Sequence, residues 1–233
     1  MPVLQDEILG QLSHEKEVDA LCKKTREYKV GKGYDSFKLL AEKVAFSNFP
    51  NILEPVRSAL AAATSLKTLS KIEELLKRIS HGIQSNESAT PRLVLDFCRK
   101  TIVREQELSK RNNELAIGKK RSYAEISAVV DHNSEVVAEN AENERQNAHY
   151  IAEFALNLAH VQLKRDDQGF KLRDTANLPI LEPFIEILLN CLESRENKVL
   201  NLALKVMGVL IPLKLPGMEA TVSTARFSAK HCI

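Results

Sequence analysis

The side chains that could catalyse a reaction or hold a metal ion lie isolated from one another along this 233-residue chain. The histidines do not pair with one another, or with cysteines, at the spacing of metal ligands; they are His14, His81, His132, His149, His160 and His231. The cysteines form no Cys-x-x-Cys pair; they are Cys22, Cys98, Cys191 and Cys232. The sequence therefore predicts no catalytic residue, no metal site, no cofactor and no small-molecule substrate.

Two short motifs suggest chemistry but lack the context that the chemistry needs. Gly31-Lys32-Gly33 has neither the spacing nor the preceding strand of a phosphate-binding loop. We interpret it as a loop between helices. Asn86-Glu87-Ser88 fits a glycosylation sequon, but the first residues lack the basic start and apolar run of a secretion signal. We therefore expect Asn86 to be unmodified.

Basic residues gather at one place, and two interpretations of this cluster stay open. It is a nuclear-import signal or a patch that contacts phosphates, or it is a run of solvated charge in a linker. No aromatic residue lies between the charges, so the pattern does not support stacking on bases. The residues of this basic cluster are Lys110, Arg111, Lys119, Lys120 and Arg121.

The composition favours a helical protein of a reducing compartment. The chain is 44% hydrophobic and 27% charged, with a net charge of +2, so no strong field directs it to nucleic acid or membrane. Aromatic residues make up only 5%, so aliphatic side chains must fill the core, which favours helices over a β-sandwich. The longest apolar stretch, residues 206–213, is too short to span a bilayer, and we expect no membrane contact.

Apolar residues recur every three or four positions over most of the chain, which indicates amphipathic helices. In the front half we expect helices over residues 4–26, 35–45, 52–63, 69–79 and 93–102. Breaks are expected at Gly31–Gly33 and at His81-Gly82, because glycine commonly follows the end of a helix. In the rear half we expect helices over residues 150–165, 180–192 and 199–211.

A change in charge separates the two helical halves. Residues 99–121 contain eight Lys or Arg against three Asp or Glu, and residues 122–144 contain six Asp or Glu and no Lys or Arg. Few apolar residues interrupt these charges, which is typical of a solvated linker. We therefore divide the chain into front repeats (1–103), a partly disordered charged linker (104–147), rear repeats (148–213) and an irregular tail (214–233).

An internal repeat relates the two halves. Ile52-Leu53-Glu54-Pro55 recurs as Ile180-Leu181-Glu182-Pro183, and the apolar register continues through a polar turn into a second helix. A single helix pair cannot bury its apolar face, whereas stacked pairs can. The pattern predicts an all-α fold, a HEAT/armadillo-like α-solenoid of antiparallel helix pairs. A compact bundle with a chance four-residue match is the alternative.

The rear half resembles a known family of repeat proteins. The stretch HYIAEFALNLAHVQLKR (149–165), then LEPFIEILLNCL (181–192), Lys198-Val199 and LKLPGME (213–219), is similar to the DRIM (down-regulated in metastasis) family. The segment GYDSF (33–37) and the helices after it resemble the preceding repeats of that family. The resemblance covers most of residues 30–219. It implies a HEAT-repeat scaffold of the small-subunit processome, many times longer than this chain.

The resemblance also implies a location and partners. It implies a nucleolar protein that works with processome proteins and the U3 small nucleolar ribonucleoprotein in maturation of small-subunit ribosomal RNA, with contacts to pre-ribosomal RNA mainly through its backbone. It carries no catalytic residue, and we expect no enzyme. Because the pattern stops after Glu219, we expect the chain to be a fragment or short product. A generic cytoplasmic HEAT-repeat adaptor for proteins is the alternative.

Overall fold

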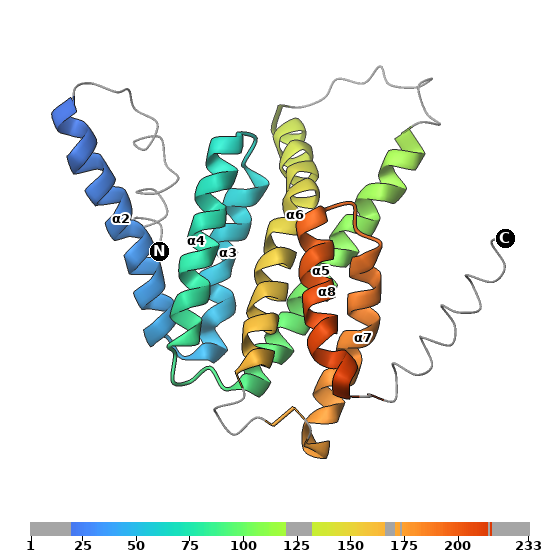
Figure 1. Ribbon diagram of the computed structural model, residues 1–233. Coiled ribbons are helices and arrows are strands. Elements are labelled where there is room, and N and C mark those ends of the chain that lie inside the picture. Colours follow the sequence, from blue (N-terminus) through green and yellow to red (C-terminus); the bar gives the residue numbers. More distant parts are fainter. Residues whose placement is uncertain (1–19, 120–131, 166–170, 173, 214, 216–233) are drawn as a thin grey trace. The chain divides into compact units, whose positions relative to one another are not determined.

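The computed structural model describes residues 20–119, 132–165, 171–172, 174–213 and 215 (Figure 1). Within this part of the chain all regular elements are helices, so the predicted all-α, solenoid-like fold is confirmed. The α-helices and 3-10 turns are α2 (Ala20–Lys43), η2 (Phe46–Asn48), α3 (Phe49–Ala61), α4 (Leu66–Gln84), α5 (Pro91–Lys119), α6 (His132–Lys164), η3 (Thr175–Asn177), α7 (Leu178–Leu192), α8 (Asn197–Leu210) and η4 (Ile211–Leu213).

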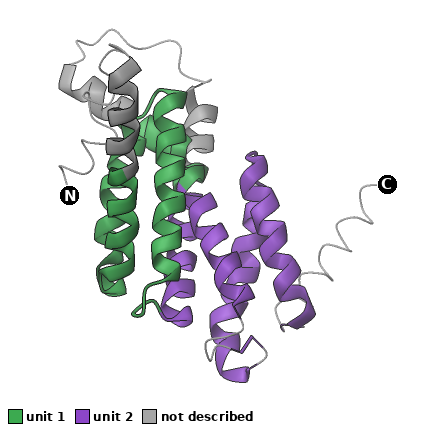
Figure 2. Cartoon of the chain, turned by 60° about the vertical axis from the view of Figure 1, so that its left-hand side comes forward, with its two compact units in different colours: residues 1–89, 108–150 green, residues 90–107, 151–233 purple. Residues whose placement is uncertain are grey.

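The chain divides into two compact units that are interleaved in sequence. Unit 1 contains residues 1–89 and 108–150, and unit 2 contains residues 90–107 and 151–233 (Figure 2). Helices α5 and α6 are each divided between the two units, with one part of the helix in unit 1 and the other in unit 2. From both sides, these helices extend into the segment 104–147, where the charge pattern predicted a linker. Residues 120–131, in the middle of that segment, lie outside the described residues.

The sequence repeat corresponds to two helical hairpins, α3–α4 in unit 1 and α7–α8 in unit 2. Each first helix follows a 3-10 turn, has proline as its second residue and contains a further proline, Pro55 or Pro183. The matched positions Leu60 and Leu188 are both buried. The repeat is therefore a structural repeat, because matched positions of the two first helices enter the core at the same places.

Helix α2 differs from the prediction, because it runs without a break through Gly31–Gly33. Gly33, Phe37 and Ala41 recur at a spacing of four residues and are all buried. This face of α2 packs within unit 1, where α2 and α4 lie against each other. The burial of this face offsets the helix-breaking tendency of glycine, which amounts to about 1 kcal/mol per residue. The expected loop at this position is wrong.

Gly82 lies inside α4 and does not end it, so the break predicted at His81-Gly82 is also wrong. A Cβ atom at Gly82 would lie 2.2 Å from the carbonyl oxygen of Lys38 and 2.8 Å from Cβ of Ala41. No side chain fits at such distances from the α2 backbone. The glycine is therefore required by the close crossing of the two helices, which is a second reason for glycine in a sequence besides a turn.

Buried side-chain amides close the ends of two helices in unit 1. Nδ2 of Asn86 donates hydrogen bonds to the carbonyls of Ala41 and Val44, both at 2.7 Å, at the C-terminal end of α2. Nδ2 of Asn147 donates to the carbonyls of Leu60 and Ala63 in the same pattern, at 2.9 and 3.1 Å. The last carbonyls of a helix lack partners within the helix, and these bonds supply donors to them; the carbonyl of Leu60 also accepts from the amide of Ala63 at 3.2 Å.

Candidate interaction surfaces

The basic cluster that the sequence predicts lies only partly within the described residues. Lys110, Arg111 and Lys119 belong to α5, where Lys119 is the last residue, and the Lys110 side chain is exposed. Lys120 and Arg121 lie outside the described residues. Helix α5 therefore carries three of the five residues of the cluster.

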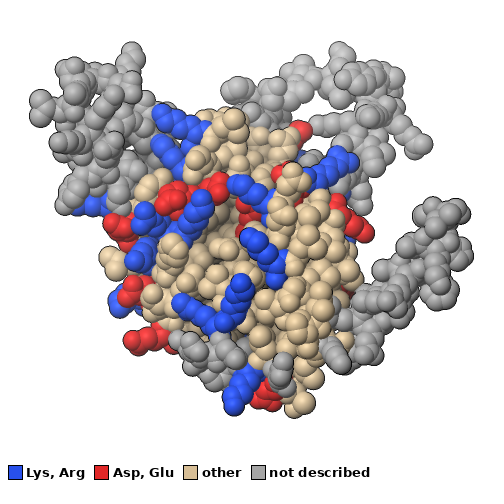
Figure 3. Space-filling model, viewed as in Figure 1, with Lys and Arg blue, Asp and Glu red and all other residues tan. Residues whose placement is uncertain are grey.

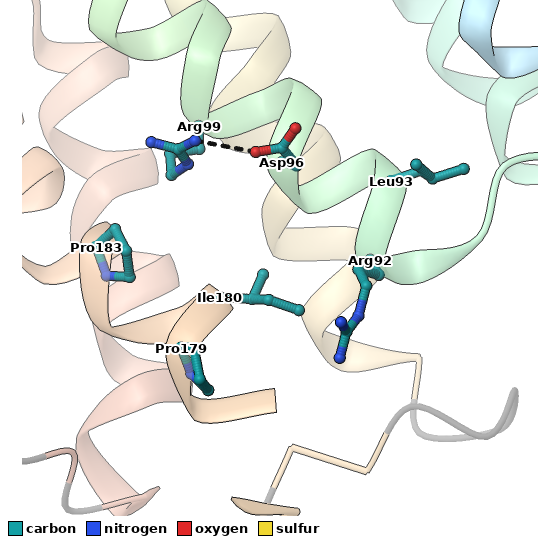
Figure 4. A pocket seen from close by; sticks show the side chains of 7 residues that line it. All are labelled: Arg92, Leu93, Asp96, Arg99, Pro179, Ile180 and Pro183. Carbon is teal, nitrogen blue, oxygen red and sulfur yellow. Dashed lines mark hydrogen bonds and ion pairs between the residues drawn. The ribbon is translucent and has the colours of Figure 1, made fainter. Parts of the chain in front are cut away.

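A pocket of about 520 Å³ lies between α5 and α7 in unit 2 (Figure 4). One wall is the charged face of α5, and the opposite wall is apolar. The lining residues are Arg92, Leu93, Asp96, Arg99, Pro179, Ile180 and Pro183. The sequence analysis did not identify this pocket, because its two walls are about 80 residues apart in the chain and each reads as an ordinary helix surface.

The charges of this pocket are engaged with one another. Asp96 accepts from Arg99 at 3.0 Å and forms an ion pair with Lys100 at 2.6 Å. Partial burial would raise the pKa of Asp96, but these two hydrogen bonds outweigh it, so the pKa lies below its usual range. Arg92 donates to the carbonyl of Ala176 at 3.2 Å. A carboxylate held in its charged form by two cations is poorly suited to accept or donate a proton in catalysis.

The two cysteine thiols in the described part of unit 2 are buried, which makes them unreactive. Burial raises the pKa of the Cys98 thiol far above its usual range, and it also raises that of Cys191, to which Gln106 donates at 3.1 Å. Such thiols are poor nucleophiles. Among the described residues no group of three His, Cys, Asp or Glu side chains could hold a metal ion.

A second charged group lies on α6 and α8 of unit 2. Burial lowers the pKa of His160, and the charges of Lys164 and Lys205 lower it further. Lys164 lies four residues after His160 on α6, and Lys205 projects from α8. Both lysines are exposed. Lys164 and Lys205 thus lie close enough to His160 to disfavour its charged form, which no pattern along the sequence revealed.

The sequence analysis did not identify the structural role of the buried side-chain amides. Asn86, 8% exposed, uses its Nδ2 atom in two hydrogen bonds, and its Oδ1 atom accepts from Ser88. A glycan would need that nitrogen, so the geometry agrees with the expectation that the sequon is unmodified. Gln106 also uses its amide inside the structure. Its Nε2 atom donates a hydrogen bond to the carbonyl of Ile187 at 2.8 Å, which links α5 to α7. In the sequence, a polar residue within the apolar stripe of a helix would have indicated such a buried amide.

The segment Thr175–Leu192 is long and apolar enough to cross a membrane by length and composition alone, which corrects the expectation that no segment reaches that length. One such helix is weak evidence, because the core helix of a soluble protein passes the same test. Phe184 and Leu188 of α7 are fully buried inside the protein. Packing on neighbouring helices is therefore a sufficient reason for the apolar character of α7.

Comparison with known proteins places these helices in context. Residues 1–102 match the family described as the U3 small nucleolar RNA-associated protein 20 domain. U3 small nucleolar RNA-associated protein 20 of Saccharomyces cerevisiae is 26% identical over 219 residues, which is 91% of this chain and 8% of that protein. Its namesake in Schizosaccharomyces pombe is 32% identical over 108 residues, 45% of this chain and 4% of that protein.

The match covers most of this chain for the budding-yeast protein and less than half of it for the fission-yeast protein, and the chain spans less than a tenth of the length of either relative. The match to the budding-yeast protein covers more than either helical hairpin alone, and the family match lies in the front half that contains α2, α3 and α4. These findings confirm the predicted resemblance: the chain is similar to a region of U3 small nucleolar RNA-associated protein 20, to which the similarity with the DRIM family pointed.

Proposed function

We propose that this chain is a non-catalytic helical scaffold that acts in ribosome biogenesis, in association with the U3 small nucleolar ribonucleoprotein and its processome. The observation that carries the proposal is the match over 91% of the chain to a protein named for its association with U3 small nucleolar RNA. The chemistry of the described side chains supports it, because the Asp96 carboxylate is paired with cations and the Cys98 and Cys191 thiols are buried.

The structure suggests how such a scaffold would work. Apolar side chains hold each hairpin together, and buried amides fix the helix ends, so the exposed faces keep a constant geometry. Stacked helix pairs present long surfaces on which several partners can bind at once. A scaffold of this kind needs helices that stay packed against one another and exposed surfaces that carry charge.

Co-purification of RNA with the tagged chain tests this proposal. The chain is expressed in cells, recovered through its tag, and the bound U3 small nucleolar RNA is compared with an unrelated small nucleolar RNA. We expect enrichment of the U3 RNA and a nucleolar signal in microscopy. A folded chain, helical by circular dichroism, that spreads through the cytoplasm and enriches neither RNA would reject the proposal in favour of a cytoplasmic adaptor.

The contribution of the basic cluster is tested separately. A variant in which Lys110, Arg111, Lys119, Lys120 and Arg121 are changed to glutamine removes its charge, and a control variant loses the same number of lysines and arginines elsewhere on exposed helix faces. If the cluster contacts phosphates, binding to a single-stranded RNA oligonucleotide weakens and depends less on salt in the first variant alone. Loss of nuclear entry with unchanged RNA binding would identify an import signal instead.

A further inference from the structure

Hydrogen bonds between α5 and α7 lie at both ends of the pocket of unit 2, which we call the α5–α7 pocket. At one end Arg92 of α5 donates to the carbonyl of Ala176, in the turn directly before α7, at 3.2 Å. Past the other end Gln106 donates to the carbonyl of Ile187 at 2.8 Å and to the sulfur of Cys191 at 3.1 Å. All lining residues fall between these contacts along both helices. The pocket is therefore bounded by two helices that are bonded to each other within unit 2.

Two prolines shape the α7 wall of this pocket. Pro179 and Pro183 lie four residues apart, so they share one side of the helix. A proline side chain is a short closed ring that does not extend far from its helix, so α7 leaves room toward α5 at this place. Ile180 and, on α5, Leu93 complete the apolar lining. The volume of about 520 Å³ is within the range of about 300–1,000 Å³ that is typical of ligand sites.

The α5 wall carries an excess of positive charge. Arg92 and Arg99 line the pocket, and the carboxylate between them, Asp96, is paired with both Arg99 and Lys100. A guanidinium has five N–H donors. The bonds to Asp96 and to the carbonyl of Ala176 each use the Nη2 atom of their arginine. Both arginines can therefore keep these partners and also bind a carboxylate of a ligand.

Charge by itself does not mark a site on this protein. On the face shown in Figure 3, Lys and Arg side chains are scattered among Asp and Glu. The α5–α7 pocket differs, because its cations stand across a concave space from an apolar wall. In Figure 4 the side chain of Ile180 extends from α7 toward Arg92, and Arg99 lies above Pro183. A ligand that satisfies both walls needs an apolar group with an anionic group on either side of it.

An extended peptide with an aliphatic residue between two acidic residues meets this requirement. Side chains two residues apart lie on the same face of an extended chain, so a Glu-x-Leu-x-Glu segment presents all three groups together. Its carboxylate-bearing residues are about 13 Å apart. Arg92 and Arg99 are separated by about 10 Å along α5, a difference that their long side chains can cover. Inorganic phosphate would leave the apolar wall unused, and none of the described residues that line the pocket is an aromatic group for stacking an RNA base.

From these observations we propose that the α5–α7 pocket binds an extended acidic peptide of a partner protein. A Leu, Ile or Val side chain of this peptide contacts Ile180 and Pro183, and the carboxylates two residues before and after it bind Arg92 and Arg99. This inference goes beyond the proposed role in ribosome biogenesis and does not depend on it, since it rests on the shape and chemistry of the pocket.

Binding of a short peptide to the full chain tests the inference. The probe is fluorescein-labelled Gly-Ser-Glu-Ser-Leu-Ser-Glu-Ser-Gly, and its fluorescence anisotropy reports binding. One control peptide has Ala in place of Leu, a second has Gln in place of both Glu residues, and a single-stranded uridine oligonucleotide is measured in parallel. We expect the probe to bind, and each of the three controls to bind at least ~10-fold more weakly, about 1.4 kcal/mol.

Variants with matched controls locate the binding site. Arg99→Gln should weaken binding of the probe by ~10-fold, because it removes a charged hydrogen bond to the peptide. Arg78→Gln is its control, since Arg78 lies in unit 1, is similarly exposed and also pairs with a carboxylate at 3.0 Å. Pro183→Leu should weaken binding as strongly, because the longer side chain fills the pocket. Its control is Pro55→Leu, at the matched position of the repeat in unit 1. Circular dichroism checks that each variant is folded.

Several results would overturn the inference. They are no binding of the probe, equal binding of the probe and the Ala or Gln peptide, or equal losses in a folded variant and its matched control. Tighter binding of the oligonucleotide than of the probe, lost in Arg99→Gln, would assign the pocket to phosphate groups of nucleic acid. The outcome of the U3 RNA experiment affects none of these results, because they are measured on the purified chain.

Discussion

Helices α4 and α8 occupy matched positions in two copies of one hairpin, yet they bury different amounts of the same pattern. Helix α4 buries eight of its residues, whereas α8 buries four, namely Val199, Ala203, Val206 and Leu210. The apolar residues on the remaining side of α8 are as large as those of α4. The comparison teaches that an apolar stripe in a repeat shows where a neighbour can pack, while the fold decides whether the chain itself supplies that neighbour.

The largest expected effect comes from truncating the matched leucines. Leu76→Ala should lower the free energy of unfolding by about 2–5 kcal/mol, because Leu76 is buried and its removal leaves a cavity. Leu204→Ala should change it by less than about 0.5 kcal/mol, because Leu204 is already in contact with water. Urea unfolding of the two variants measures both. Equal losses of stability would show that Leu204 is as buried as Leu76, and the difference between α4 and α8 would be wrong.

The two glycines should respond to alanine with opposite signs. Gly82→Ala should destabilise the protein by about 1–3 kcal/mol, because the added methyl group meets the backbone carbonyl of Lys38. Gly208→Ala should stabilise it by about 0.5–1 kcal/mol, because nothing opposes the methyl group and alanine favours the helix. Thermal unfolding followed by circular dichroism compares them. A stabilising Gly82→Ala would mean that α2 does not cross α4 closely.

The buried amides of unit 1 can be tested against an exposed amide of unit 2. Asn147→Ala should cost about 1–3 kcal/mol, because it removes the buried side-chain donor that the carbonyls of Leu60 and Ala63 share. Asn201 on α8 is exposed, and Asn201→Ala should stay within about 0.5 kcal/mol of the original protein. Chemical denaturation measures the difference. Similar small effects at both positions would remove the helix-end role that we assign to Asn147.

The smallest effect concerns pH and His160 of unit 2, which two lysines influence. Burial, Lys164 and Lys205 lower the pKa of His160, so the unfolded chain binds a proton at higher pH than the folded chain does. Stability should therefore be complete above the unfolded pKa of about 6.5 and decrease as pH falls through the lower folded pKa. His160→Gln should flatten this part of the profile of melting temperature against pH. A profile that keeps its slope in that variant would exclude His160 as the cause.

Several helix boundaries were predicted from the sequence in both halves. The break expected between residues 63 and 69 is confirmed, since Ser65 caps α4 by accepting from the Lys67 amide at 3.2 Å. The helix expected from residue 93 begins two residues earlier, at Pro91, and the end expected at Arg165 lies directly after the last residue of α6. These boundaries follow from local causes, such as a capping hydroxyl or a proline that fits the first helical turn.

The predictions that failed involve glycine, which has more than one use. The sequence pattern treated Gly31, Gly33 and Gly82 as ends of helices, whereas all three lie inside helices. A glycine that stops a helix and a glycine that admits another backbone look identical along the chain, since both follow from the absence of Cβ. The distinction at Gly82 needs the position of α2, more than 40 residues earlier in the sequence.

By itself, the sequence determined that the chain is helical, that it repeats a hairpin, where most helices begin and end, and which family it resembles. These properties depend on the spacing of apolar residues and on caps, which act over a few residues. Only the tertiary structure decided which apolar stripes are covered, that Asn86 and Asn147 close helix ends, and that Lys205 lies near His160. Those facts depend on contacts between distant segments, and the residues on one side of such a contact do not specify the other side.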